Sequence, residues 1–377
     1  MTRIAVENGR VIDPETDVVE TRTLAIEEGR FVDTLSGCAE QIVDAEGAYV
    51  APGFVDLHTH VFNHGLFAHS RLDADRIGVD QGVACVVDAG SSGAGTIDAF
   101  EQMVVNTQRT RVFAFVNIGS PGMPGLGGGH ASRPELCDLD GTVRAFERHG
   151  SWLVGVKVLA SRSHTGSFGI EAVKLARKAA ELVGKPLMLH IGNAPPVIDD
   201  VLDLLRPGDI ITHSYHGKIG GVLGYRGEVI RPFREAVARG VVVDLGHGRS
   251  SFSFRVCEHA LAQGMPLHCI STDLHRGNLD HPVVSLARTM SKMCALGFPL
   301  PDVVRAVTSN PARAIGRDSE GLGTLRVGAP AALTVFREVE EPWRVEDAEG
   351  EVRDLDRRLE TVGVLLGTAY YPRTEAL

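Results

Sequence analysis

The sequence lacks the features that mark nucleic-acid-binding and membrane-spanning proteins. Its 377 residues carry a formal net charge of −10 without a run of lysine or arginine, which argues against a nucleic-acid or anionic-membrane partner. No apolar stretch approaches the roughly 18 residues of a membrane-spanning helix. The first residues, MTRIAVENGRVIDPE, contain no apolar signal core. We therefore expect a cytoplasmic protein with no membrane association.

The sequence also shows no cysteine pattern typical of disulfide bonds, and two common functional motifs are absent. The six cysteines form no C-x-x-C pair and most have apolar neighbours, which favours reduced thiols. The chain has no G-x-S-x-G motif, so serine hydrolase chemistry is unsupported. The segment GSSGAG at 90–95 lacks the dinucleotide-binding fingerprint.

The two ends of the chain are typical of β structure. Asn8-Gly9 and Glu28-Gly29 each separate two arms of alternating apolar residues, which predicts two hairpins. From about residue 321 the chain returns to strand-like segments such as GTLRVGAPAALTVF. We predict that residues 1–51 and 321–377 form one small β-sandwich domain.

The middle of the chain, residues 52–320, has the pattern of an α/β fold, the (β/α)8 or TIM barrel. Amphipathic segments such as 169–184 alternate with short runs that are apolar at nearly every position, as in strands buried on both faces of a parallel sheet. The Gly- and Pro-rich segment 119–141 is either a lid over the barrel mouth or an ordinary long loop. The eight apolar runs are 53–58, 83–88, 111–118, 154–159, 186–191, 209–214, 241–246 and 268–273.

Residues that commonly bind metals lie at or near the C-terminal ends of five predicted strands. Function in such barrels sits at that face, so these side chains would converge. A single histidine at such a place is more often a half-buried structural residue. Independent core histidines, however, have no reason to fall at the ends of successive strands, and the joint pattern predicts a metal site. The candidates are His58, His60, Lys157, His190, His213 and Asp273.

The candidate ligands differ in the structural roles that they could have instead of binding a metal. The spacing of His58 and His60 places both imidazoles on one face of a strand. Lys157 lies inside an apolar strand, where burial disfavours the ammonium ion. It is either paired with a carboxylate or a neutral amine that takes up carbon dioxide to become a carbamate. Asp273 is either a helix N-cap or ion-pair partner, or a metal ligand that accepts a proton from the attacking water.

Taken together, these residues resemble the amidohydrolase superfamily in its dihydroorotase-like branch. The resemblance implies a binuclear metal-dependent hydrolase. In it His58, His60 and Asp273 bind one divalent ion, His190 and His213 bind the other, and carbamylated Lys157 bridges both. Zinc suits these ligands, and manganese or iron fits the same set. The motifs that carry the resemblance are APGFVDLHTH (51–60), GVKV (155–158), LMLHIG (187–192), DIITHSYHGKIGG (209–221), STDLH (271–275) and TSNPARAIG (308–316).

The resemblance also implies a reaction and a class of substrate. A metal-bridged hydroxide attacks a carbonyl, and Asp273 transfers the proton to the leaving group. Phe62 stands where dihydroorotases carry a carboxylate-binding arginine. The better match is a deacetylase subgroup that acts on small acylated substrates, such as N-acetyl-D-amino acids or acetylated 2-hydroxy acids. A cyclic amide hydrolase of the dihydroorotase or hydantoinase type is the alternative, and a metal-free scaffold protein is a third reading.

A small-molecule substrate that bears a carboxylate requires a cation at the rim of the barrel. Arg226 is favoured because it follows the sixth strand, although each candidate is more often a surface charge. Tyr215, His216 and His275 would bond the carbonyl or oxyanion. The oligomeric state is left open, a homo-oligomer included. The candidate cations are Lys218, Arg226, Arg231, Arg249 and Arg276.

Overall fold

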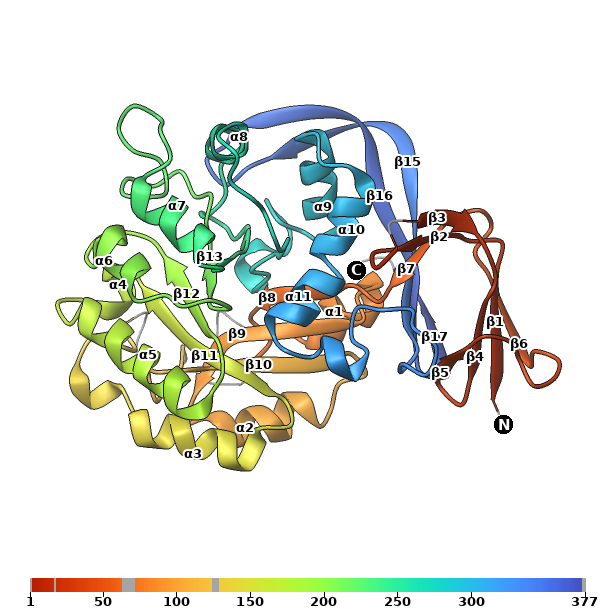
Figure 1. Ribbon diagram of the computed structural model, residues 1–377, viewed down its shortest axis with the longest axis horizontal. Helices are drawn as coiled ribbons and strands as arrows, with labels where there is room; N and C mark the ends of the chain where they lie inside the picture. Colours follow the sequence, from red (N-terminus) through yellow and green to blue (C-terminus); the bar gives the residue numbers. More distant parts are fainter. Residues whose placement is uncertain (1, 17, 63–71, 124–128, 375–377) are drawn as a thin grey trace.

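A curved parallel sheet forms the centre of the protein (Figure 1). The computed structural model describes residues 2–16, 18–62, 72–123 and 129–374. Within these ranges the sheet has seven strands, and each pairs with the next along the chain, as in a barrel. The strands are β8 (Val55–Thr59), β9 (Cys85–Gly93), β10 (Arg111–Asn117), β11 (Leu153–Ala160), β12 (Leu187–Ile191), β13 (Ile210–Thr212) and β14 (Val242–Val243).

The eighth predicted strand closes the ring without forming a regular strand. Isolated parallel bridges join Asp244 to Cys269 on one side and Thr59 to Leu274 on the other. Backbone hydrogen bonds run from Asp273 N to His58 O at 2.7 Å and from His60 N to Leu274 O at 2.9 Å. The segment 268–274 therefore lies between β14 and β8, where the predicted barrel requires a strand.

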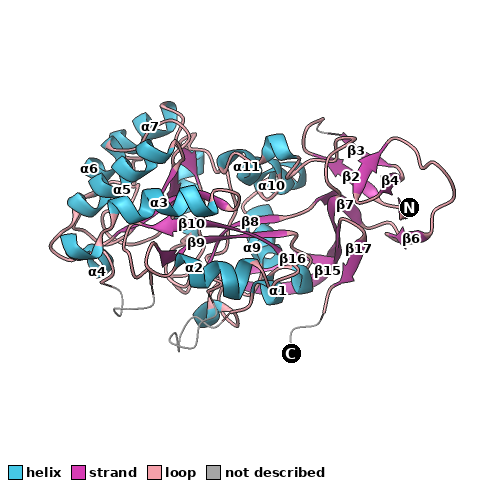
Figure 2. Cartoon of the chain, turned by 90° about the horizontal axis from the view of Figure 1, so that it is seen from below, coloured by secondary structure: helices cyan, strands magenta, loops and turns pink. Residues whose placement is uncertain are grey.

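Helices cover the outside of this sheet (Figure 2). The predicted helix at 169–184 is α5 (Ile170–Val183), and Gly184 ends it in the left-handed conformation at φ +62°. No helix in the described ranges is long and apolar enough to cross a membrane. The other helices of six residues or more are α3 (Leu139–His149), α6 (Ile198–Asp203), α7 (Arg231–Ala238), α8 (Phe254–Ala262), α9 (Leu286–Ala295), α10 (Leu300–Ala306) and α11 (Ser309–Ala314).

Two further sheets, built from both ends of the chain, lie beside the barrel (Figure 1). Buried residues of both sheets share one apolar cluster, which includes Ile26, Val50 and Leu333. One sheet has the order β5-β4-β1-β6 and the other β17-β16-β15-β7-β2-β3. Their strands are β1 (Arg3–Glu7), β2 (Arg10–Asp13), β3 (Val18–Thr21), β4 (Leu24–Glu27), β5 (Arg30–Val32), β6 (Gln41–Asp44), β7 (Tyr49–Pro52), β15 (Ala332–Glu346), β16 (Val352–Leu366) and β17 (Ala369–Pro372).

Of the two predicted hairpins, one forms. Glu28-Gly29 joins β4 and β5, which pair antiparallel, as predicted. The prediction for Asn8-Gly9 is wrong, because β1 pairs with β4 and β6 while β2 pairs with β3 and β7. Asn8 does adopt a turn conformation at φ +57°. The turn sends the chain from one sheet to the other, since both edges of β1 are already taken.

The C-terminal hairpin reaches from the small sheets across the barrel. Figure 1 shows β15 and β16 arching toward α8. Val345, near the far end of β15, and Leu359, midway along β16, belong to the apolar core of the barrel. The Asp347 carboxylate accepts a hydrogen bond from the Phe254 backbone at 2.9 Å, at the start of α8. The hairpin thus fastens the barrel to the terminal sheets.

Two other predictions concern loops and thiols. The segment 119–141 joins β10 to α3, and residues 124–128 of it lie outside the described residues. Its role as a lid stays a prediction. All six cysteines are free thiols, as predicted, although Cys38 is exposed.

Candidate metal site and its surroundings

Three of the predicted ligands form a compact group at one end of the barrel. His58 lies in β8, His60 follows that strand, and Asp273 comes from the closing segment 268–274. Asp273 Oδ1 is 3.1 Å from His60 Nε2 and 3.6 Å from His58 Nε2. One ligand atom from each of the three lies within 4.8 Å of the others. This spacing is that of groups able to share one metal ion.

A second group of predicted ligands lies directly beside the first. The rings of His190 and His213 are 4.3 Å apart between centroids, and the His213 ring is 4.9 Å from that of His58. Lys157 Nζ lies 3.4 Å from His58 Nε2. The structure therefore brings all six predicted residues into one cluster, from four strands of the barrel and the closing segment 268–274.

Hydrogen bonds to Nδ1 orient three of the four imidazoles. His58 Nδ1 bonds Thr212 Oγ1 at 2.8 Å, and His60 Nδ1 bonds Ser91 Oγ at 2.8 Å. His213 Nδ1 donates to the Gly246 carbonyl at 2.6 Å. Because Nδ1 is engaged in each case, Nε2 is the nitrogen available to a metal, which is the usual arrangement around metal-binding histidines.

Buried carboxylates stand behind these hydroxyl groups. The Thr212 hydroxyl donates to Asp244 Oδ2 at 2.7 Å, and the Ser271 hydroxyl donates to the same oxygen at 2.8 Å. Burial raises the pKa of Asp244 to about 6. On the other side, Asp88 accepts a hydrogen bond from the Ser91 backbone at 2.7 Å. Asp244 and Asp88 could not be predicted as part of the site, because nothing in their local sequence marks them.

Lys157 has no carboxylate partner that would hold it as an ammonium ion. Its side chain is completely buried, and within the described ranges no carboxylate oxygen lies in ion-pair distance of Nζ. Burial lowers its pKa to about 8. Gly90, at φ +82°, makes room for it, since a Cβ there would lie 2.6 Å from Lys157 Cβ. The charges of Asp273, Asp244 and Asp88 act against this lowering, so the carbamate on Lys157 stays a prediction.

Asp273 is held in an uncommon backbone conformation. Its φ is +52°, and Asn278 donates from its side-chain amide to the Asp273 carbonyl at 2.8 Å. Burial raises the pKa of its carboxyl group, but the hydrogen bond to His60 and the charges of His213 and His60 lower it more. The net pKa of Asp273 is below the ordinary value, so its carboxyl group is ionised near pH 7.

The donor set fits divalent metal ions. Burial lowers the pKa values of His58, His190 and His213, so these three imidazoles are neutral near pH 7, and Asp273 supplies a negative charge. Nitrogen and carboxylate ligands of this kind suit zinc and similar transition metals. A glycine also makes this packing possible: a Cβ on Gly246, at φ +50°, would lie 2.3 Å from Thr212 Oγ1.

Two of the predicted substrate-binding residues lie close to the ligands. Lys218 bonds Ser251 Oγ at 3.3 Å, and its charge lowers the pKa of both His190 and His213. In the described part of the chain it forms no ion pair with a carboxylate. His275 interacts electrostatically with Asp273, and its Nδ1 accepts from the Gly277 backbone at 2.9 Å.

His216 borders a neighbouring cavity of about 450 Å³ that Lys218 also lines. Its Nδ1 accepts a hydrogen bond from the Lys218 backbone at 3.1 Å. Its buried Nε2 has no partner among the described residues. His216 is thus a polar group at the edge of the site.

The structure does not support Tyr215 or Arg226 as substrate-binding residues. Tyr215 is fully buried in the core, and its hydroxyl donates to the Pro266 carbonyl at 2.5 Å. Arg226 is exposed in the turn between Leu223 and Val229. The Tyr215 hydroxyl is thus engaged within the core, and a substrate role for Arg226 stays a prediction.

The other candidate cations also point to solvent. Arg231 pairs with Glu235 at 2.6 Å and its side chain is 86% exposed. Arg249 and Arg276 are exposed, although the charge of Arg249 reaches His275. Phe62, by contrast, is buried and packs edge-on against Phe100, with ring centroids 5.2 Å apart. An apolar side chain therefore occupies this place beside the site.

Two histidines that the sequence analysis missed extend the cluster. The His164 ring is 5.6 Å from that of His190 and 5.0 Å from that of His130. His130 is buried, and neither of its ring nitrogens has a hydrogen-bond partner among the described residues. Burial lowers its pKa to about 3, so the ring is neutral. His130 lies in the long loop before α3, so it could not be predicted from the residues at the ends of strands.

Comparisons with known proteins point to one superfamily. A model of the amidohydrolase family matches residues 41–101. A deacetylase of Agrobacterium fabrum is 37% identical over 348 residues, which cover 89% of this chain and 84% of that protein. A deacetylase of Enterococcus faecalis is 33% identical and the match covers 98% of both chains.

Solved structures agree with these relatives. A structure described as an adenine deaminase is 31% identical with a TM-score of 0.91, and the match covers 99% of this chain and 100% of the other. A structure described as a dihydroorotase is 32% identical with a TM-score of 0.90, covering 100% and 99%. The similarity therefore includes the terminal sheets as well as the barrel.

Proposed function

The chain belongs to the amidohydrolase superfamily, and from that premise we propose that it is a metal-dependent deacetylase of small, carboxylate-bearing acylated substrates. That it is a hydrolytic enzyme follows from the family and from the deacetylase relatives. The observation that carries the proposal is the single cluster of His58, His60 and Asp273 against His190 and His213. N-acetyl-D-amino acids and acetylated 2-hydroxy acids are the substrates we favour.

We assign the metal ligands in two sets. His58, His60 and Asp273 would hold one divalent ion, and His190 and His213 the other, with zinc the first candidate. Lys157 lies between the sets and, as a carbamate, would contribute an oxygen to each. When bound, such ions polarise the acyl carbonyl and lower the pKa of a water molecule.

The chain's own groups then move the proton and hold the substrate. Asp273 Oδ1 faces the two histidines, which leaves Oδ2 to accept a proton from the attacking water and return it to the leaving nitrogen or oxygen. Lys218 is the cation that we assign to the substrate carboxylate, because it has no carboxylate partner of its own among the described residues. His275 would bond the carbonyl oxygen, because it lies close enough to Asp273 to interact with it electrostatically.

We also propose that two parts of the chain form separate domains with different roles. Residues 52–320 would form the catalytic barrel, and residues 1–51 and 321–377 the small β-sandwich domain. The shared cluster of Ile26, Val50 and Leu333 supports this division. The hairpin β15–β16 would couple the two parts, since its far end packs on the barrel.

The direct test is acetate release by zinc-loaded protein. Matched D and L N-acetyl amino acids and (R) and (S) acetylated 2-hydroxy acids are compared with their carboxamide analogues. We expect turnover of one enantiomeric series and a loss of at least tenfold in kcat/KM when the carboxylate becomes an amide, about 1.4 kcal/mol. Lys218→Met should abolish this preference, whereas Arg226→Gln, a matched change in the same loop region, should keep it.

A cyclic amide hydrolase is the second candidate, and the 32% identical structure described as a dihydroorotase favours it. Phe62 argues against it, because this buried ring leaves no cation at that position. Dihydroorotate, a hydantoin and adenine belong in the same assay. Turnover of one of these without acetate release from any acetylated substrate would replace the deacetylase proposal. A metal-free scaffold would be indicated by purified protein that binds no zinc at all.

A further inference from the structure

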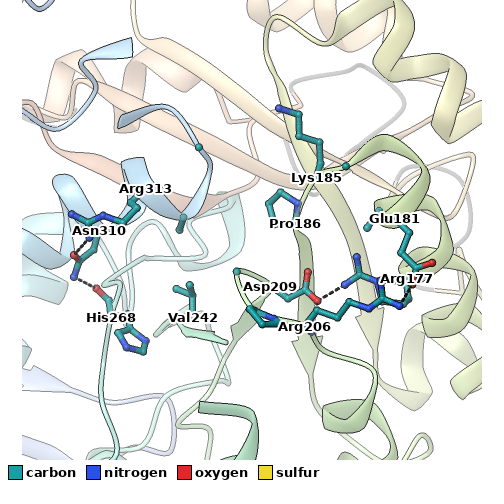
Figure 3. A pocket seen from close by; sticks show the side chains of 16 residues that line it. Arg177, Glu181, Lys185, Pro186, Arg206, Asp209, Val242, His268, Asn310 and Arg313 are labelled. Atoms are coloured by element: carbon teal, nitrogen blue, oxygen red, sulfur yellow. Dashed lines mark hydrogen bonds and ion pairs between the residues drawn. The ribbon is translucent and has the colours of Figure 1, made fainter. Parts of the chain in front are cut away.

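A second cavity, drawn in Figure 3, is lined by residues near the N-terminal ends of barrel strands, whereas the metal ligands lie toward the C-terminal ends. Its volume is about 790 Å³, which is in the range of small-molecule sites. Its walls come from the end of α5, from the loops that precede β12, β13 and β14, from the start of segment 268–274, and from α11. Nothing in the proposed function uses this cavity.

The position of the cavity separates it from catalysis. Pro186 lines it at the start of β12, and His190 is four residues further along the same strand. At 3.3 Å per residue this places the two about 13 Å apart. Asp209 and His213 are related in the same way across β13. A molecule in this cavity cannot touch the metal ligands.

The cavity is electropositive in an acidic protein. Four cationic side chains and two carboxylates line it, an excess of two positive charges, whereas the whole chain has a net charge of −10. The carboxylates are already engaged. Asp209 pairs with Arg177 and accepts from two backbone amides, and Glu181 is shared by Arg206, Arg177 and the neighbouring Lys178.

Two of the cations are left without a counter-charge. The backbone N–H of Lys185 donates to the Ala180 carbonyl at 3.1 Å, but its ammonium group has no ion pair or hydrogen bond among the residues that the structure describes. Arg313 bonds only the side-chain oxygen of Asn310, at 3.2 Å. Figure 3 shows Arg313 and Asn310 on one wall and Arg206 with Arg177 on the other, with Pro186 and Val242 between them. The cavity thus has a cationic group on each side of an apolar floor.

His268 adds a donor to the Arg313 side. Its Nδ1 accepts a hydrogen bond from the Val243 backbone at 2.9 Å, so in the neutral ring the proton is on Nε2. Burial lowers the pKa of His268, which favours this neutral form. The Nε2–H group belongs to a residue that lines the cavity, and it can donate to an anion there.

We propose that this cavity binds a small organic dianion, two carboxylates joined by a short apolar spacer. One carboxylate lies against Lys185, and the other against Arg313 and His268. The spacer covers Pro186 and Val242. The ligand is neither substrate nor product of the site at the other end of the barrel.

The experiment is calorimetric titration of the zinc-loaded enzyme with adipate, with uncharged adipamide as the matched ligand. We expect saturable binding of adipate and none of adipamide. The double variant Lys185→Gln/Arg313→Gln should weaken adipate at least tenfold. Lys178→Gln, which removes one charge from the same helix outside the cavity, should change it less than twofold.

Three results would overturn the proposal. They are no adipate binding at 10 mM, equal binding of adipamide, or a double variant that binds adipate like the wild type. The last would indicate binding at the metal ions. All three substituted side chains are at least partly exposed, so the variants should fold, and circular dichroism checks this. The readout does not depend on any deacetylase activity, so this proposal and the proposed function can fail separately.

Discussion

Thr212→Val tests whether the hydroxyl behind His58 prepares it to bind metal. Valine has nearly the same shape but cannot bond His58 Nδ1, now at 2.8 Å, or donate to Asp244 Oδ2, now at 2.7 Å. All three residues are completely buried, so water cannot replace the lost partner. Asp244 Oδ2 keeps its hydrogen bond from Ser271, so His58 Nδ1 is the group left unpaired, at a cost of about 1–3 kcal/mol.

The same change should weaken metal binding, because His58 loses the bond that fixes its ring. Removing a partner of this kind typically lowers metal affinity 10–100-fold, about 1.4–2.8 kcal/mol. Zinc affinity is measured by competition with a chelator, and the free energy of unfolding by denaturant titration of the metal-free protein. Activity at saturating zinc should recover in large part, since the ligand itself remains.

Thr289→Val is the matched control. Thr289 is equally buried, on α9, and its hydroxyl donates to the Ser285 carbonyl at 3.1 Å without touching a ligand. It should lose about 1 kcal/mol of stability and none of its zinc affinity. If Thr212→Val bound zinc as tightly as Thr289→Val, the hydroxyl would not be what positions His58, and the reasoning would fail.

Three further predictions concern the reaction. Asp273→Asn should lower kcat by about 10²–10⁴-fold, as for loss of a general acid–base group, with zinc content measured in parallel; a variant that keeps its zinc and its rate contradicts the proton-transfer role. Only the neutral amine of Lys157 reacts with carbon dioxide, and the pKa of Lys157 is about 8. At fixed dissolved carbon dioxide, the rate at which metal-free protein recovers zinc-dependent activity should therefore rise about tenfold per pH unit up to pH 8 and then level off. A rate that is flat from pH 6 to 9 argues against the carbamate. His130→Phe should raise KM at least tenfold with little change in zinc affinity, because the unpaired ring nitrogens would meet the substrate; an unchanged KM would make His130 a structural residue.

The sequence was informative where side-chain chemistry is tied to the ends of strands. His58, His190 and His213 could be placed together because parallel strands end at the same face of a barrel. The barrel itself followed from the apolar runs, even though the eighth run pairs only through isolated bridges. The chemistry of the side chains and the periodicity of the apolar runs were therefore enough to predict the barrel and the cluster of histidines.

The residues that support the ligands could not be found in this way. Thr212 and Asp244 meet only because β13 and β14 pair in a particular register, which no local pattern records. His130 lies in an irregular loop with no periodicity to read. The hairpin at Asn8 failed for a related reason, since the turn signal is local while the choice of partner strand is made by the whole sheet.

The closing segment also determines when during synthesis the protein can first hold a metal ion. The Thr272 backbone donates to Asp56 at 3.0 Å and that of Asp273 to His58 at 2.7 Å, contacts between residues 216 and 215 positions apart. Contacts of such separation form late in folding. A nascent chain that stops short of residue 273 has the four imidazoles of the predicted ligand set, but it has neither a closed barrel nor the Asp273 carboxylate. Tight metal capture would therefore mark the moment at which the barrel is complete.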